Sequence, residues 1–472
     1  MRLTIADLFE GSSFYDAYQL YNRGAAYILE EGYKRAQENG VGIIDPLPLG
    51  DYVRSLPLVS YAAQLVPRFY VFSGTKSNLQ NVASYGEVVS DPRAREPHSR
   101  VQQATGTETI VNQVGKKAAD EKIKIAKNLA GIQGANFNVV FAYAKDLAKN
   151  ISTHWQDDES FQNNMTYVGA KIIGKCFLGI DHLPREYVKL LRQANDLISG
   201  EKADPDQLAQ MSEKIIQMSD ALLDKNAQEV IAANRYANTQ YPLNGDETEE
   251  EIKTKLINSH AGAGFIVESN LSFLLMVAIA YISESPEIYE QMMQEINRMP
   301  TETLDDTKQL TYMKCIYRET LRIASGTAVV PRVTSVYSEM EVENSEQEKH
   351  NCSIYPNSYL FFPVRMIHHN KALWPNPQAF DPTRFSRQIK SNTSGFIDKD
   401  FFAFSAGKRG CPAGTGFVEY AFIGFLTEFY KANKLQLDRP IETIPATAIH
   451  PRWKEEYYAT IETLDRSIIK YG

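Results

Sequence analysis

The sequence is poor in cysteine and in basic charge, and each shortage excludes a class of protein. Its four cysteines are widely scattered, with no close pair of the kind that builds a zinc cage, and this usage suits a reducing compartment. The 50 Lys and Arg residues are outnumbered by 58 Asp and Glu, and the net charge of −8 argues against a general nucleic-acid-binding protein, which usually carries a basic face. We therefore expect no nucleic-acid partner.

Long apolar runs are also lacking. The first 40 residues carry acidic residues that exclude a membrane span or a signal peptide there, among them Asp7, Glu10, Asp16, Glu30 and Glu31. The most apolar stretch, residues 271–282, has only about twelve residues, a length typical of a buried core helix. The sequence therefore predicts a soluble, cytoplasmic protein with no transmembrane segment.

No linker or repeat divides the chain. The middle contains no Gly/Ser run, no proline-rich spacer and no block of like charge, and no repeat of fixed period is present. With 472 residues and a hydrophobic content of 43%, the chain can bury a large core. We expect a single domain over residues 1–472.

Helical periodicity is the main pattern in the sequence. Apolar residues recur at helical spacing in four segments: residues 116–129, 166–178, 312–323 and 417–429. Strand-like segments, rich in β-branched and aromatic residues and broken by turn formers, are fewer: residues 68–72, 333–342 and 358–364. The sequence predicts a mainly α protein with a smaller β-sheet portion, located at approximately residues 60–90 and 330–365.

The longest predicted helix begins with a capping-box pattern, Thr248-Glu-Glu-Glu251, and continues to about Ser283. Because its second half is apolar on nearly all sides, this helix must be buried in the middle of the molecule. Two later helices have polar residues placed to cap their first turns: Ser285, ahead of Pro286, and Thr311.

The strongest chemical pattern surrounds Cys411, in residues 404–414, FSAGKRGCPAG. The cysteine stands at the mouth of a helix expected to begin near Gly414, where amide donors and the positive helix end favour thiolate over thiol. Glycines on either side let the backbone approach something flat and bulky, and Arg409 adds a cation suited to a carboxylate. Thiolate is a known class of haem ligand, but most lone cysteines are buried and inert. These residues alone leave both interpretations open.

The segment resembles the haem-ligand loop of the cytochrome P450 superfamily, F-x-x-G-x-R-x-C-x-[GA]. It matches at Phe404, Gly407, Arg409, Cys411 and Ala413. The resemblance implies a cytochrome P450 fold, a haem b cofactor (iron protoporphyrin IX) and Cys411 as the axial ligand of its iron. It also implies that Phe404, Gly407 and Arg409 are cofactor-binding residues.

Other elements of this family precede the loop in the expected order. Glu319-Thr-Leu-Arg322 resembles the family's E-x-x-R pair, and the spacing puts both side chains on one helical face; taken alone, such pairs are usually solvated contacts. Arg384, within Phe-Asp-Pro-Thr-Arg-Phe, resembles the arginine that completes a buried structural triad with that pair. Arg332 stands where the family often places a second arginine for a haem propionate. The resemblance is strong over the last third of the chain and poor over the first half.

The resemblance weakens where family monooxygenases carry [AG]-G-x-[DE]-T, an acid and an alcohol that deliver protons during oxygen activation. Counting back from the next helix places Glu268 and Ser269 near this position as catalytic residues. Aligning on residues 271–273 instead places Phe265 and Ile266 there, without a relay. We favour Glu268 and Ser269, because a carboxylate inside an apolar helix is costly without a role or partner.

Two other features have no family match. The family's tryptophan or histidine and arginine for a haem propionate are missing between residues 90 and 130, where a run of lysines is more typical of a solvated face: Lys116, Lys117, Lys122 and Lys124. The adjacent His368 and His369 have no third ligand nearby, so packing is a better interpretation than metal binding.

We expect a haem-thiolate monooxygenase that inserts an oxygen atom from dioxygen into an apolar small molecule, with electrons from a separate ferredoxin or reductase. One alternative keeps the haem without the acid–alcohol relay, as in a P450-type peroxygenase or a hydroperoxide-rearranging enzyme. A second is a non-catalytic haem protein that binds a ligand or gas. The substrate is not readable from the sequence, because similar scaffolds host many reactions.

Overall fold

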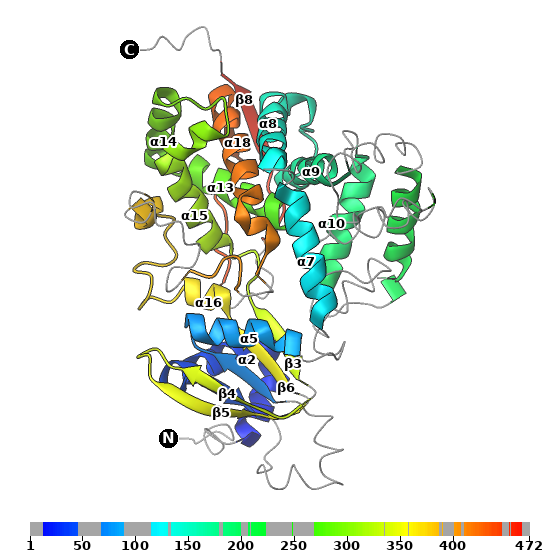
Figure 1. The fold of residues 1–472 in the computed structure, drawn as a ribbon. Helices are drawn as coiled ribbons and strands as arrows, with labels where there is room; N and C mark the ends of the chain where they lie inside the picture. The colour runs from blue at the N-terminus through cyan, green and yellow to red at the C-terminus, as the bar shows by residue number, and fades with distance from the viewer. Residues whose placement is uncertain are drawn as a thin grey trace.

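Helices form most of the structure, and small sheets form the rest (Figure 1). The computed structural model describes residues 13–45, 68–88, 115–130, 134–178, 183–199, 206–207, 209–222, 248, 269–334, 336–356, 358–386, 389, 401–406, 410–445, 453 and 455–464. The main helices are α2 (Ser13–Asn39), α5 (Lys76–Val88), α7 (Gly115–Ala130), α8 (Ala135–Lys149), α9 (Phe161–Ile173), α10 (Arg185–Ser199), α13 (Ser269–Glu284), α14 (Pro286–Arg298), α15 (Thr311–Ala324) and α18 (Phe417–Ala432). The predicted mainly α class is confirmed.

Helix α13 lies at the centre of the larger apolar core. Every residue from Leu271 to Ala280 is buried, as its all-round apolar composition predicts. Helix α9 crosses it closely, since a Cβ atom at Gly169 would lie only 2.0 Å from Ser272 Oγ. The predicted end of this helix is confirmed within one residue, but residues 249–268 lie outside the described part, and Thr248 is described as non-helical.

Of the two capping residues predicted after α13, Ser285 occupies the expected position and Thr311 does not. Ser285 precedes Pro286 as expected, but its side chain makes no capping hydrogen bond. Thr311 is itself the first residue of α15, and Glu295 of α14 caps that helix instead. Its carboxylate accepts hydrogen bonds from the amides of Tyr312 and Met313 at 2.8 and 2.9 Å. A carboxylate can satisfy two exposed amides at once and favours the positive helix end, which a single hydroxyl cannot match.

The main sheet joins segments from opposite ends of the chain. Its strand order is β1-β2-β6-β3, with β2 and β6 parallel and the other pairs antiparallel: β1 (Val41–Ile44), β2 (Phe69–Phe72), β3 (Val330–Thr334) and β6 (Ser358–Phe362). Alternate residues of β6 are buried, and on its other face the rings of Tyr359 and Phe361 stack with Phe69. Helices α2 and α5 contribute to the core beside this sheet (Figure 1).

The strand predicted over residues 333–342 is two strands in different sheets. Thr334 ends β3, and its hydroxyl bonds both the carbonyl and the amide of Val336 in a tight turn. The chain then enters a separate hairpin of β4 (Ser338–Glu343) and β5 (Lys349–Ile354). The β region predicted near residues 60–90 contains β2 but also helix α5. A third pair, β7 (Asn433–Leu437) with β8 (Ala459–Thr463), was not predicted.

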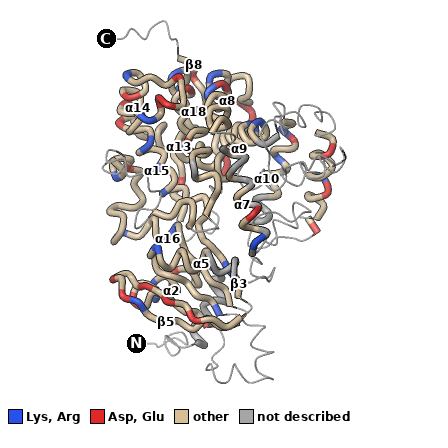
Figure 2. The backbone as a smooth tube through the Cα atoms, viewed as in Figure 1, with Lys and Arg blue, Asp and Glu red and all other residues tan. Residues whose placement is uncertain are grey.

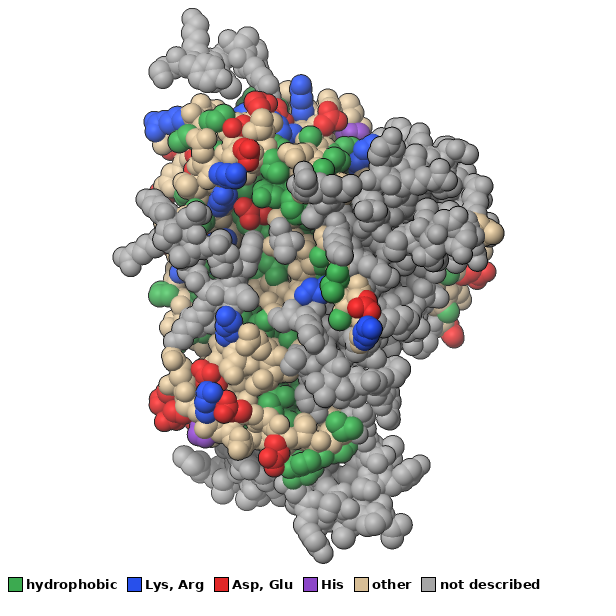
Figure 3. Space-filling view, in the orientation of Figure 1, with side chains coloured by type: hydrophobic (Ala, Val, Ile, Leu, Met, Phe, Trp, Pro, Cys, Tyr) green, Lys and Arg blue, Asp and Glu red, His purple; other side chains and the backbone are tan. Residues whose placement is uncertain are grey.

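Charged residues lie along the β4–β5 hairpin and on helices such as α8 and α14, while α13 carries only Glu284 (Figure 2). On the face shown in Figure 3, acidic and basic side chains of the described residues are interspersed. Within the described ranges, no single helix is long and apolar enough to cross a membrane.

Candidate functional site

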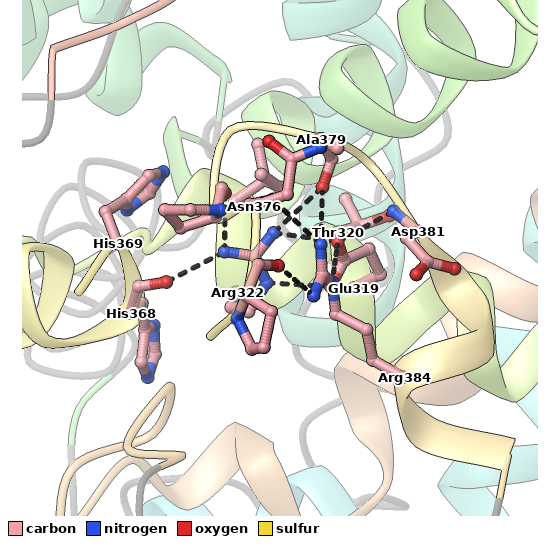
Figure 4. A network of polar contacts seen from close by, with 12 residues as sticks. Glu319, Thr320, Arg322, His368, His369, Asn376, Ala379, Asp381 and Arg384 are labelled. Atoms are coloured by element: carbon pink, nitrogen blue, oxygen red, sulfur yellow. Dashed lines mark hydrogen bonds and ion pairs between the residues drawn. The ribbon is translucent and has the colours of Figure 1, made fainter. Parts of the chain in front are cut away.

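The structure brings Glu319, Arg322 and Arg384 together (Figure 4). Glu319 and Arg322 form a two-pronged ion pair on α15, with Oε1–Nη2 and Oε2–Nε distances of 2.7 and 2.8 Å, and both side chains are fully buried. Arg384 lies in a 3₁₀ turn (Pro382–Phe385), and its Nε is 3.4 Å from Glu319 Oε1. The backbone amide of Asp381 donates to the same oxygen at 2.8 Å. The three residues thus share one carboxylate.

The remaining guanidinium donors bind backbone carbonyl oxygens. Arg322 Nη1 donates to the carbonyls of His368 and Pro377, each at 2.8 Å. Arg384 Nη2 donates to the carbonyl of Asn376 at 2.9 Å. Through the bonds of Arg322, helix α15 holds the chain at His368 and at Pro377. This arrangement fits a structural triad, because each guanidinium nitrogen of the two arginines bonds Glu319 or a backbone carbonyl.

Burial and charge act in opposite directions on Glu319. Burial raises the pKa of its carboxyl, and the guanidinium groups of Arg322 and Arg384, with the Asp381 amide, oppose that shift. Two cations share one anion here, but the peptide carbonyls around them supply compensating negative dipoles. Loss of any partner would therefore leave charge in a buried site.

Cys411 lies at the start of a 3₁₀ turn (Pro412–Thr415), and α18 follows only at Phe417. The expected helix start near Gly414 is therefore a short turn, separated from α18 by Gly416, whose φ of 130° ordinary residues rarely adopt. The Cys411 amide donates to the carbonyl of Phe404 at 2.8 Å. Of the four cysteines, Cys411 is the exposed one. It is thus the cysteine that a large planar group can reach.

Burial nonetheless raises the pKa of the Cys411 thiol, although its surface is accessible. Accessibility decides whether a ligand reaches the sulfur, and the pKa shift reflects the surrounding protein. The amides of Ala413 and Gly414 and the charge of Lys122 lower the pKa and oppose burial. A metal cation bound to sulfur would displace the thiol proton outright. An accessible thiol with amide donors and a nearby cation fits a haem-iron ligand.

Lys122 is the functional candidate that the sequence did not single out. It lies on α7, which packs against the turn after Cys411. Nothing in the sequence separates it from Lys116, Lys117 and Lys124, because all four belong to one charge run. The packing of α7 against this turn brings the charge of Lys122 close enough to act on the thiol.

The Phe404 ring packs closely against the turn after Cys411. A Cβ atom at Gly414 would lie 2.7 Å from Cγ of the Phe404 ring, so only glycine fits there. Ser405 has a φ of 60°, in the left-handed region that favours glycine. The close contact with Gly414 and the left-handed backbone of Ser405 therefore both constrain the position of Phe404.

The other expected site residues are placed less completely. Gly407 and Arg409 lie outside the described residues, as does Glu268. Ser269 is the first residue of α13, and Asn270 next to it lies against the turn after α15, because a Cβ atom at Gly326 would be 2.9 Å from Asn270 Oδ1. The choice between Glu268-Ser269 and Phe265-Ile266 as the distal residues is therefore not made by the structure.

Arg332 is buried in β3, an edge strand of the main sheet. Its guanidinium donates to the carbonyl of Ala83 in α5 at 3.2 Å and to that of Pro331. Both of these acceptors are peptide carbonyls. A haem propionate is a chemically suitable partner for such a guanidinium.

His368 and His369 are buried, as the packing interpretation predicted. Burial lowers the pKa of His368 well below its usual value and that of His369 to about 3. Within the described part of the chain, no three His, Cys, Asp or Glu residues are grouped to hold a metal ion. Both histidines are therefore neutral core residues at physiological pH.

These neutral histidines predict acid sensitivity. A histidine whose pKa is lower in the folded protein than its unfolded value of about 6.5 contributes its full stabilisation above pH 6.5. That contribution is lost as the pH falls towards the folded-state pKa. When the pH falls from 7.5 to 5, each histidine should lower the unfolding free energy by about 2 kcal/mol. Urea titrations at both pH values should show this loss, and His369→Phe should remove its share. An equal pH dependence in wild type and variant would contradict the assignment.

The fold and the site define a mainly helical protein with an accessible cysteine thiol and a buried charge triad. The sequence matches the family model "Cytochrome P450" over residues 87–430. Because this match covers well over half of the sequence, the chain belongs to the cytochrome P450 family. The family is one of haem-thiolate oxidoreductases, so a haem cofactor and an oxygenase-type function are implied.

Solved structures confirm the predicted cytochrome P450 fold. The chain is similar to the cytochrome P450 CYP102L1 (12% identity, TM-score 0.62, covering 84% of this chain and 89% of that one). It is also similar to a zebrafish cytochrome P450 with abiraterone (14% identity, TM-score 0.61, covering 84% of this chain and 94% of that one). A third similar structure is the cyanobacterial CYP120A1 with retinoic acid (14% identity, TM-score 0.65, covering 93% of this chain and 96% of that one). No curated relative matches the sequence.

Proposed function

We propose that the chain is a haem-thiolate monooxygenase that inserts one oxygen atom of dioxygen into an apolar small molecule. The observation that carries the proposal is the accessible thiol of Cys411 in a chain of the cytochrome P450 family. A separate ferredoxin or reductase supplies the electrons, and residues 1–472 form one domain. The abiraterone and retinoic acid in two similar structures support an apolar substrate class for this chain.

The residues present fit haem b as the cofactor, which supplies the oxygen-activating chemistry when bound. Cys411 holds the iron through sulfur, and the amides of Ala413 and Gly414 stabilise the thiolate. Arg332, Arg409 and Lys122 are the cations for the propionates. Glu268 and Ser269 hold and deliver the protons that oxygen reduction consumes.

The test of this function is a ferrous–carbon monoxide spectrum, a screen for substrate-induced spin shifts, and turnover with an electron-donor system or with peroxide. We expect a red-shifted thiolate-type Soret band and a product that contains one oxygen atom from dioxygen. Turnover with peroxide alone would favour a peroxygenase or hydroperoxide-rearranging enzyme. A thiolate-type band without any turnover would favour a non-catalytic haem protein.

The double variant Glu268→Gln, Ser269→Ala should keep the thiolate-type band and the substrate-induced spin shift. It should form much less product per electron, with hydrogen peroxide rising instead, because one acid–base group typically contributes about 10²–10⁴-fold. Peroxide-driven turnover should suffer less and serves as the control. Coupling as efficient as in wild type would favour Phe265 and Ile266 as the distal residues, and with them an enzyme that lacks the relay.

Arg332→Ala should release haem roughly tenfold faster than wild type, because a charge-assisted hydrogen bond to a propionate would be lost. Transfer of haem to an excess of apo-myoglobin measures this rate. Arg332 also bonds the carbonyl of Ala83, so the thermal stability of the haem-free chain is measured in parallel. Equal haem-loss rates would remove Arg332 from the propionate site.

A further inference from the structure

His368 connects the end of α15 with the segment that leads to Cys411. It is the last residue of α16 (Val364–His368), and its side chain is fully buried. Its Nδ1 lies 3.0 Å from Ser325 Oγ, at the turn that ends α15. Its Nε2 accepts a hydrogen bond from the Phe402 amide at 2.9 Å. Its backbone carbonyl accepts from Arg322 of the triad (Figure 4).

These contacts select one neutral form of the ring. The Ser325 hydroxyl donates its hydrogen to the carbonyl of Arg322 at 2.8 Å, so it can only accept from Nδ1–H of His368. Nε2 must then keep its lone pair for the Phe402 amide. The Nδ1–H tautomer satisfies both nitrogens, whereas a protonated ring would place a second N–H against that amide.

The ring is also fixed by aromatic packing. It stacks on Phe401, with centroids 5.4 Å apart and planes 18° apart, and meets the Trp374 ring nearly edge-on at 6.2 Å. The Phe402 carbonyl in turn accepts from the Ser405 amide at 3.0 Å, and the Phe404 carbonyl accepts from the Cys411 amide. A short series of backbone hydrogen bonds thus links His368 to Cys411.

We propose that His368 is a positioning residue for Cys411. It holds residues 401–406 at a fixed place relative to the end of α15, and so it sets the direction from which the sulfur faces the iron. It acts through Phe402 and does not touch the cofactor. The inference rests on the proposed function, since this direction matters for ligation only if Cys411 binds haem.

The test compares variants of the full-length chain. His368→Phe keeps an aromatic ring and loses both side-chain hydrogen bonds, whereas the amide oxygen of His368→Gln can still accept from Phe402. His369→Phe is the matched control, because His369 is also buried but its Nδ1 contacts the carbonyl of Arg365 in the adjoining helix α16. Two quantities are measured: the thiolate-type share of the ferrous–carbon monoxide Soret band, and hydrogen exchange at the Phe402 amide without haem.

We expect His368→Phe to exchange the Phe402 amide roughly tenfold faster, as loss of one buried hydrogen bond predicts, and to lose most of the thiolate-type band to a thiol-type band. His368→Gln should restore much of both, and His369→Phe should change neither. If His368→Phe does not fold, His368→Asn replaces it, because that amide reaches Ser325 but not Phe402.

A folded His368→Phe with the wild-type band and exchange rate overturns the proposal. Equal losses in the Phe and Gln variants also overturn it, since the residue would then serve packing alone. A wild-type protein without the thiolate-type band refutes the proposed function instead. In that case the Phe402 exchange rate still decides whether His368 holds the segment.

Discussion

Cys411→Ser should abolish the thiolate-type Soret band of the ferrous–carbon monoxide complex completely. Serine lacks the sulfur that gives this band, and its oxygen is a much weaker match for the iron. The fold should survive, because the side chain is accessible and serine is a favourable residue at the start of a helical turn. We expect the unfolding free energy to change by no more than about 0.5 kcal/mol.

Cys352→Ser provides the matched control. Cys352 is buried in β5, in the hairpin away from α18, and burial raises the pKa of its thiol to about 11. This change should leave the Soret band in place while costing some stability. If Cys411→Ser kept the band, the haem would have another ligand and the central assignment would be wrong.

The second large effect is expected at Glu319. Glu319→Ala leaves Arg322 fully buried without its carboxylate, which typically costs about 3–5 kcal/mol. Since a domain's whole stability is about 5–15 kcal/mol, most of the variant should be poorly folded and depleted of haem. Arg384 and the Asp381 amide would lose an acceptor at the same time. The yield of folded protein and the haem-to-protein ratio measure the effect.

The control is an ion pair with the same helical spacing on the surface. Asp305 and Lys308 are also three residues apart, but their side chains are 85% and 76% exposed. Asp305→Ala should therefore change the unfolding free energy by less than about 1 kcal/mol. A normally stable, fully haem-loaded Glu319→Ala protein would contradict the structural role of the triad.

Local patterns in the sequence determined much of this protein. The apolar run at residues 271–282 predicted a buried helix because no face of it could meet water, and α13 is that helix. The spacing of Glu319 and Arg322 put both side chains on one helical face, where they meet. The contact between Gly414 and the Phe404 ring lies within the same loop, and the sequence did not predict it.

Contacts between distant segments were decided only by the tertiary structure. Glu295 caps α15 because α14 folds back beside it, and Lys122 acts on Cys411 because α7 packs against the turn after it. No local pattern predicts that His368 reaches Phe402, since the two residues are 34 positions apart and meet only in the folded chain. Hydrophobic periodicity depends on neighbours within about one helical turn, whereas these contacts depend on how whole elements are placed.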